Sequence, residues 1–324
     1  MEGCALLPFE YEASASLNLE EKAVEDGISL ITFDAPYEPE VPQSKRVRVY
    51  YYKSESPVAN LVFLHGIRNG NIPYLAWLAK RFSKHGIDSY YMILPYHEKR
   101  APDGWRGGEP FFSPSPAKCV VKFHEAVKDV RRTVDVISMR SDLPIFIMGY
   151  SFGGMIATMS LAVEKRLKGG VLSFTGGDWR WINWHSPVTD ELREMYRREG
   201  NEFGCRSERD CLRFRKDPLS IVERFEKVED IFKKSPVTCF HYDPLSFAKF
   251  VNQPVLFFKG IFDLVIPCPA TEELIRVLPN KKVVSIPSGH KSSYFFRRFI
   301  ARLAVKFVKK HAMEASNTQI TSFS

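Results

Sequence analysis

Short apolar runs alternate with amphipathic segments along most of this chain. Apolar runs of this length, bounded by turn residues, are typical of strands in the interior of a sheet. They predict strands at 28–33, 47–52, 59–64, 89–94, 145–148, 170–174, 254–259 and 282–286. Apolar positions at helical spacing predict helices at 73–85, 117–139 and 271–278, after residue 154 and from residue 296. Such alternation favours a mostly parallel sheet with helices on both sides.

The alternation stops in one long region, at 178–250. No strand is predicted there, and 190–234 contains twelve acidic and twelve basic residues, which favours exposed helices. We therefore expect a helical cap inserted into an α/β core made of 28–177 and 251–312. The remaining segments are predicted to be an N-terminal extension on the surface (1–27) and a C-terminal tail (313–324).

The composition is that of an ordinary soluble globular protein, with 44% hydrophobic and 26% charged residues among 324. No apolar run approaches the ~20 residues that span a bilayer. The first twelve residues contain acids and lack the basic start and apolar centre of a secretory signal. We expect a cytoplasmic protein that does not associate with membranes.

The net charge of +8 comes mainly from one segment, because residues 291–310 contain seven basic residues and no acid. Nucleic-acid binding would require a basic face with exposed aromatics or a known module, and neither is evident, so no nucleic-acid partner is expected. The alternative of a helix lying on an anionic membrane is less favoured than packing on the sheet. The apolar stripe predicted for that packing is Phe296, Phe299, Ile300, Leu303 and Phe307.

The six cysteines contain no CxxC pair, and in a cytosolic protein most would be reduced. Cys205, Cys211, Cys239 and His241 are close in sequence, so a zinc site or a Cys205–Cys211 disulfide are open alternatives. Their spacing matches no standard zinc pattern. We expect neither a metal nor a cofactor.

The most informative stretch is Gly149-Tyr150-Ser151-Phe152-Gly153, between a predicted strand and a predicted helix. A Gly-x-Ser-x-Gly turn in this position lifts the serine hydroxyl above the sheet. Working residues in parallel sheets lie at the carboxyl ends of the strands. Four candidates follow strands here, in the order His65-Gly66, Ser151, Asp263 and His290. A serine, an acid and a histidine in this order indicate nucleophilic catalysis.

These motifs resemble the α/β-hydrolase superfamily over nearly the whole core, 28–177 and 251–310. The resemblance includes the serine turn, His65-Gly66, Gly260-x-x-Asp263-x-x-x-Pro267 and Gly289-His290. It implies an α/β-hydrolase fold with a mostly parallel sheet. The loop containing Pro95-Tyr96-His97, Arg100 and Gly108-Glu109 also resembles a little-studied esterase-like subgroup of prokaryotic hydrolases.

The resemblance and the chemistry imply the same roles. Ser151 is a weak nucleophile until a base takes its proton, and His290 is the candidate base. Asp263 would orient the imidazole and stabilise the imidazolium. Asp178 also follows a strand and is the alternative acid. The oxyanion would be bound by the backbone N–H groups of Phe152 and Ile67.

We predict a serine hydrolase that cleaves an ester or related acyl bond. An acyltransferase, a thioesterase, a peptidase or a non-catalytic binding protein with this fold remain alternatives. The substrate would be a small or medium acyl ester with a hydrophobic part, bound by His65, Gly66, His97, Arg100 and Trp179. His97, Arg100 and Arg106 could orient a polar or acidic substrate; the alternatives are that these loop residues are solvated or pair with Glu98 and Glu109. For Trp179, Trp181 and Trp184 the alternative is that they pack the cap.

Overall fold

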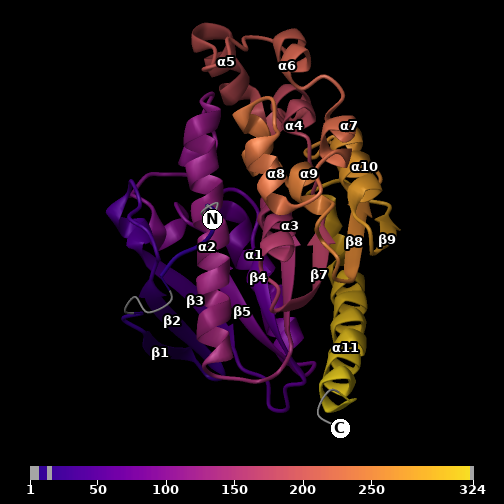
Figure 1. Ribbon diagram of the computed structural model, residues 1–324. Coiled ribbons are helices and arrows are strands. Elements are labelled where there is room, and N and C mark those ends of the chain that lie inside the picture. The colour runs from indigo at the N-terminus through magenta and orange to yellow at the C-terminus, as the bar shows by residue number, and fades with distance from the viewer. Residues whose placement is uncertain (1–6, 13–16, 322–324) are drawn as a thin grey trace, which may run out of the picture.

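The computed structural model describes residues 7–12 and 17–321 and contains the predicted sheet (Figure 1). Its strands are β1 (Glu20–Glu25), β2 (Ile28–Asp34), β3 (Arg46–Tyr52), β4 (Ala59–Leu64), β5 (Ile87–Ile93), β6 (Ile145–Tyr150), β7 (Leu167–Ser173), β8 (Val255–Gly260) and β9 (Lys281–Ile286). The spatial order is β1-β2-β3-β5-β4-β6-β7-β8-β9. The pairs from β1 to β5 are antiparallel, and those from β5 to β9 are parallel. The prediction of a mostly parallel sheet is confirmed.

Helices cover both faces of this sheet, as the alternation predicts. The helices of the described chain are α1 (Ile72–Ser83), α2 (Pro116–Ser138), α3 (Phe152–Val163), α4 (Trp179–His185), α5 (Asp190–Glu199), α6 (Glu208–Phe214), α7 (Pro218–Glu223), α8 (Val228–Lys233), α9 (Pro244–Ala248), α10 (Cys268–Val277) and α11 (Arg297–Thr321). One apolar core contains residues of α2, α3, α9 and α10, and the other contains residues of α1 and α11. The central strands β4, β5 and β6 are buried along their whole length because both cores contact them.

The region between β7 and β8 forms α4–α9, which we call the helical insertion. The described chain contains no strand there, so the helical prediction for this region is confirmed. Figure 1 shows these helices gathered beyond one end of the sheet, above β7 and β8. Short 3-10 turns connect some of them, including Thr238–Tyr242.

Both ends of the chain differ from the sequence prediction. Residues 20–25 are not an extension but strand β1, which pairs with β2 at the edge of the sheet. Phe9 is fully buried against His124, Phe232 and Phe247, so this part of the N-terminal segment is packed and not superficial. At the other end α11 continues to Thr321, through most of the expected tail. Residues 1–6, 13–16 and 322–324 lie outside the described part.

The buried stripe of α11 is also corrected. Ile300, Ala304, Val305 and Val308 pack on the sheet, whereas Phe299 is exposed. Of the predicted stripe, Ile300 is buried, and Phe296, Leu303 and Phe307 are partly buried against the same core. Alanine lets the helix approach the sheet closely, and Ala304 was not part of the predicted stripe. Among the described residues, no helix is long and apolar enough to cross a membrane.

Candidate active site

Ser151 lies in a strained turn between β6 and α3. Its φ of 55° and ψ of −119° fall outside the regions that residues with a side chain ordinarily adopt. Its N–H donates to the Ser173 carbonyl over 2.8 Å, which ties the turn to β7. A Cβ at Gly149 would lie 2.2 Å from the Gly153 carbonyl oxygen, and one at Gly153 would lie 2.5 Å from the His65 carbonyl oxygen. The two glycines are therefore required for the close approach of strand, helix and loop.

Asp263 and His290 meet at the ends of β8 and β9. His290 Nδ1 lies 2.8 Å from Asp263 Oδ2. The second oxygen, Oδ1, accepts from the N–H groups of Val265 at 2.9 Å and Ile266 at 3.0 Å, so the carboxylate has a fixed orientation. With the Nδ1 proton assigned to the bond with Asp263, His290 Nε2 has a lone pair that can accept a proton.

Asp178, the alternative acid, has other partners. It is fully buried and accepts from Arg215 Nε at 3.1 Å. Arg215 also pairs with Asp243, so one arginine of the helical insertion joins two carboxylates. The acid that contacts His290 in this structure is Asp263.

The loop that contains His290 is held against the serine turn. The Tyr150 hydroxyl donates to the His290 carbonyl over 3.2 Å, and Ser293 Oγ donates to the same carbonyl over 2.5 Å. The rings of Tyr150 and His290 have centroids 5.9 Å apart, and Tyr150 directly precedes Ser151. Within the described chain, no hydrogen bond joins the Ser151 hydroxyl to His290. Such bonds are commonly long without substrate and shorten in the reactive complex.

The loop after β4 lies directly beside Ser151. A Cβ at Gly66 would lie 3.3 Å from the Ser151 Cβ. Asn71 fixes this loop, because its Oδ1 accepts from the Gly66 N–H at 3.0 Å and its Nδ2 donates to the Ile67 carbonyl at 2.7 Å. The N–H groups of Ile67 and Phe152 donate no hydrogen bond to any other described residue. Both residues line the same pocket as Ser151.

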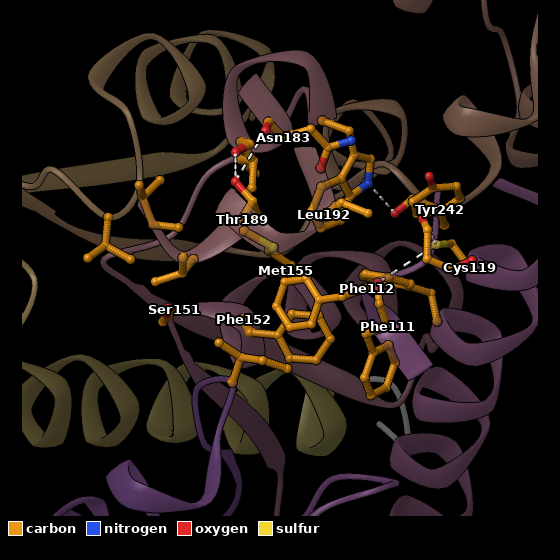
Figure 2. A pocket seen from close by; sticks show the side chains of 18 residues that line it. Phe111, Phe112, Cys119, Ser151, Phe152, Met155, Asn183, Thr189, Leu192 and Tyr242 are labelled. Carbon is orange, nitrogen blue, oxygen red and sulfur yellow. Dashed lines mark hydrogen bonds between the residues drawn. The ribbon is translucent and has the colours of Figure 1, made fainter. Parts of the chain in front are cut away.

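Ser151 opens into an apolar pocket between the core and the helical insertion, with an empty volume of about 580 Å³ that includes space open to solvent. Figure 2 shows Ser151 at one side and Cys119 and Tyr242 at the other, with the rings of Phe111, Phe112 and Phe152 between them. The remaining lining residues are Ile67, Ser113, Phe123, Met155, Trp179, Ile182, Asn183, Val188, Thr189, Leu192, Val265 and Ile266. Most of them come from loops and the helical insertion, which the sequence pattern does not place against Ser151.

Trp179 is the one side chain, among the five residues expected to contact substrate, that lines this pocket. Its Nε1 donates to the Tyr242 carbonyl over 3.2 Å, and its ring packs on Phe123. Trp179 therefore both packs against its neighbours and lines the pocket. Trp181 and Trp184 do not line the pocket: Trp181 donates to Glu273, and Trp184 lines a second cavity.

His65, His97 and Arg100 lie beneath the site and do not line the pocket, which corrects the expectation of direct substrate contact. All three are fully buried. His65 Nε2 accepts from the Leu94 N–H at 3.0 Å, and burial lowers the pKa of His65 to about 4. Arg100 pairs with Asp129 at 2.7 Å, away from Glu98 and Glu109. These residues form a rigid base under the Gly66 loop.

Arg106 lies on the same loop as these residues but near the surface. Its N–H donates to Glu109 Oε1 at 2.6 Å, and its guanidinium pairs with Glu191 of α5 at 2.7 Å. Arg106 therefore does interact with Glu109, as one alternative from the sequence suggested, but through its backbone N–H. The side chain instead connects the loop to the helical insertion.

The residues Cys205, Cys211, Cys239 and His241 were considered as a zinc site or as the source of a disulfide, and the structure supports neither. Cys205, Cys211 and Cys239 are free thiols, so the Cys205–Cys211 disulfide is absent. They line the second cavity, and burial raises the pKa of Cys211 to about 11 and that of Cys239 to about 12. No group of three or more His, Cys, Asp or Glu among the described residues is placed to hold a metal ion, so the zinc alternative is not supported.

No protein-family model and no curated protein sequence matches this chain. Solved structures do match. Acetyl xylan esterase 1 from Thermoanaerobacterium sp. JW/SL YS485 has a TM-score of 0.60 at 17% identity, over 91% of both chains. The acetyl xylan esterase from Paenibacillus sp. R4 has a TM-score of 0.60 at 18% identity, over 88% of both. The α/β hydrolase GrgF from Penicillium sp. sh18 has a TM-score of 0.55 at 15% identity, over 91% of this chain and 99% of that one. The chain has the α/β-hydrolase fold.

Proposed function

We propose that the protein is a serine hydrolase that cleaves a carboxylic ester or related acyl bond through an acyl-Ser151 intermediate. The observation that carries the proposal is the position of Ser151. It lies in a positive-φ turn that lines an apolar pocket, and the preceding residue, Tyr150, contacts the His290 of a His290–Asp263 pair that is already hydrogen-bonded. Esterases among the matched structures support the same class of reaction.

In the first half-reaction, Ser151 Oγ would attack the carbonyl carbon while its proton passes to His290 Nε2. Asp263 would stabilise the resulting imidazolium. The N–H groups of Phe152 and Ile67 would bind the oxyanion, because both border the pocket and neither has another acceptor. The C–O bond to the leaving alcohol then breaks, and the alcohol takes the proton from His290.

In the second half-reaction, a water gives its proton to His290 and adds to the acyl carbon. The tetrahedral intermediate collapses, the bond to Ser151 Oγ breaks and the serine recovers its proton. The acid product leaves and the enzyme is restored. No other reactant is needed.

The pocket favours a small or medium acyl group. Its lining is mainly aliphatic and aromatic, and pockets of a few hundred cubic ångströms enclose small organic ligands. His97 and Arg100 are buried and do not line the pocket, so neither side chain is available there to orient a polar or acidic substrate.

The test is hydrolysis of p-nitrophenyl esters of increasing acyl length. Wild type should release p-nitrophenol fastest from short or medium esters. Asp263→Asn should reduce kcat by about 10⁴-fold, because the imidazole tautomer is then wrong. Equal activity in wild type and Ser151→Ala would refute the proposal, and so would no release from any ester.

A further inference from the structure

Exposed apolar side chains surround the loops that carry the acid and the base. Phe262 and Leu264 flank Asp263 and are 65% and 79% exposed, and Phe295, five residues after His290, is 80% exposed. Exposed single hydrophobic residues are ordinary, but several together at the edge of a site mark an interaction surface. We call this set the apolar rim: Ile261, Phe262, Leu264, Tyr294, Phe295 and Phe299.

The two halves of the apolar rim belong to one surface next to the pocket. The Phe262 N–H donates to the Ser288 carbonyl over 3.0 Å, and the Asp263–His290 bond joins the same two loops. Beyond Leu264 the chain turns inward, and Val265 and Ile266 line the acyl pocket. A molecule lying on the apolar rim would therefore be beside the pocket mouth.

A row of positive charge continues from the apolar rim along α11. Arg298, Arg302 and Lys306 are exposed and follow each other at four-residue intervals, so they lie on one side of the helix. We call these three the basic stripe. No ion pair joins any of them to a carboxylate within 7–12 and 17–321, and residues 291–310 contain no acid at all. Ile300, Ala304 and Val308 hold the opposite face against the sheet.

We propose that the apolar rim and the basic stripe form a docking surface for an anionic lipid bilayer, with the pocket mouth facing the bilayer. Exposed phenylalanines and leucine insert favourably at the boundary between headgroups and acyl chains. Neighbouring Lys and Arg are attracted to anionic headgroups. A second copy of the chain fits less well, because a symmetric contact would bring two acid-free basic stripes together.

This proposal goes beyond hydrolysis and takes up the alternative that the sequence disfavoured, in which the basic face of the last helix lies on an anionic membrane. The contact is peripheral, through side chains of two loops and one helix face. Its test measures binding and not activity, so it can fail or succeed independently of the proposed reaction.

The experiment is co-sedimentation of the full chain with vesicles of phosphatidylcholine alone or mixed with phosphatidylglycerol. Wild type should bind the mixed vesicles and not the neutral ones, and added salt should weaken binding. Arg298→Glu with Arg302→Glu should weaken it by about 30-fold or more, since each basic residue near an anionic surface contributes about a fivefold affinity. Phe295→Ser with Phe299→Ser should weaken it as well.

Matched controls change equivalent residues elsewhere. Lys165→Glu and Met139→Ser alter an exposed base and an exposed apolar residue outside the rim and stripe, and both should bind like wild type. Circular dichroism checks that every variant is folded. The proposal is overturned if wild type does not bind mixed vesicles, if the controls lose binding equally, or if the rim variants change only self-association in ultracentrifugation.

Discussion

Trp179 donates its indole N–H to the Tyr242 carbonyl over 3.2 Å, and this bond holds a wall between two cavities. The acyl pocket lies on one side, and the cysteine-lined cavity of the helical insertion, with an empty volume of about 380 Å³, lies on the other. Trp179 and Asn183 line both. The size of the side chain at 179 should therefore set the length of the acyl group that fits.

We predict that Trp179→Leu shifts the preferred p-nitrophenyl ester to a longer acyl chain. The change removes part of the wall and opens space toward the second cavity. The control is Trp184→Leu, which enlarges the second cavity without touching the acyl pocket. An unchanged chain-length profile in Trp179→Leu, or the same shift in both variants, would show that Trp179 does not limit the substrate.

Asn71→Ala should lower kcat by about tenfold, since Asn71 holds the loop that carries the Ile67 N–H and loss of a whole oxyanion donor costs about 100- to 1000-fold. KM should change little, because Asn71 is not among the pocket residues. Asn69→Ala is the matched control. Asn69 lies in the same loop but bonds to Trp105 and Glu98, so steady-state kinetics of that variant should resemble wild type.

The buried group of Asp178, Arg215 and Asp243 should be critical for stability. Arg215→Met would remove the cation that joins the two buried carboxylates, leaving Asp178 only its longer pair with Arg180, and breaking such a group costs about 3–5 kcal/mol. Urea unfolding followed by circular dichroism would measure the loss. Arg213→Met changes an exposed arginine two residues earlier, near the end of α6, and should stay near wild type. A loss as small as that of the control would mean that the group does not anchor the helical insertion.

Glu273 should make stability depend on pH. Burial raises the pKa of Glu273 to about 7, with a smaller contribution from Asp178, although its hydrogen bond with Trp181 opposes the shift. A carboxyl group with a raised pKa is protonated more readily in the folded state. The contribution of Glu273 to folding stability is therefore fully present at pH values below its ordinary pKa, near 4.5. It is lost as the pH rises through its folded-state pKa of about 7.

We expect Glu273→Gln to gain stability relative to wild type between pH 5 and pH 8, measured as the difference in urea midpoints at each pH. The glutamine cannot acquire the buried charge. Glu272→Gln is the control, because Glu272 is exposed and pairs with Lys259 at the surface. A difference between Glu273→Gln and wild type that does not change with pH would contradict this assignment.

Much of the fold follows from local pattern. β4 and β6 are short apolar runs buried along their whole length, which is the arrangement that such runs predict. β1 was missed because Glu20–Glu25 is a polar, exposed edge strand without an apolar run, and its pairing with β2 is what makes it a strand. The predicted stripe of the last helix packs on the core except for Phe299, but Ala301 and Ala304, which also contact the core, were not predicted.

The residues of the candidate site also include some that local sequence pattern predicts and some that it does not. Ser151, Asp263 and His290 follow strands in a recognisable order, and the structure brings Asp263 and His290 into contact. Asn71 has no sequence signal, because its role depends on which carbonyls its amide reaches after the loop folds. His97 and Arg100 look like substrate ligands in a polar loop, but the fold places them beneath it, with Asp129 as the partner of Arg100.

The central claim is that Ser151 is an activated nucleophile, and covalent labelling by a fluorophosphonate tests it most directly. Intact-mass analysis should find one adduct in wild type, mapped to Ser151, and none in Ser151→Ala. Ser113→Ala is the matched control, since Ser113 lines the same pocket away from His290 and should label like wild type. No adduct in wild type, or equal labelling of Ser151→Ala, would contradict the account.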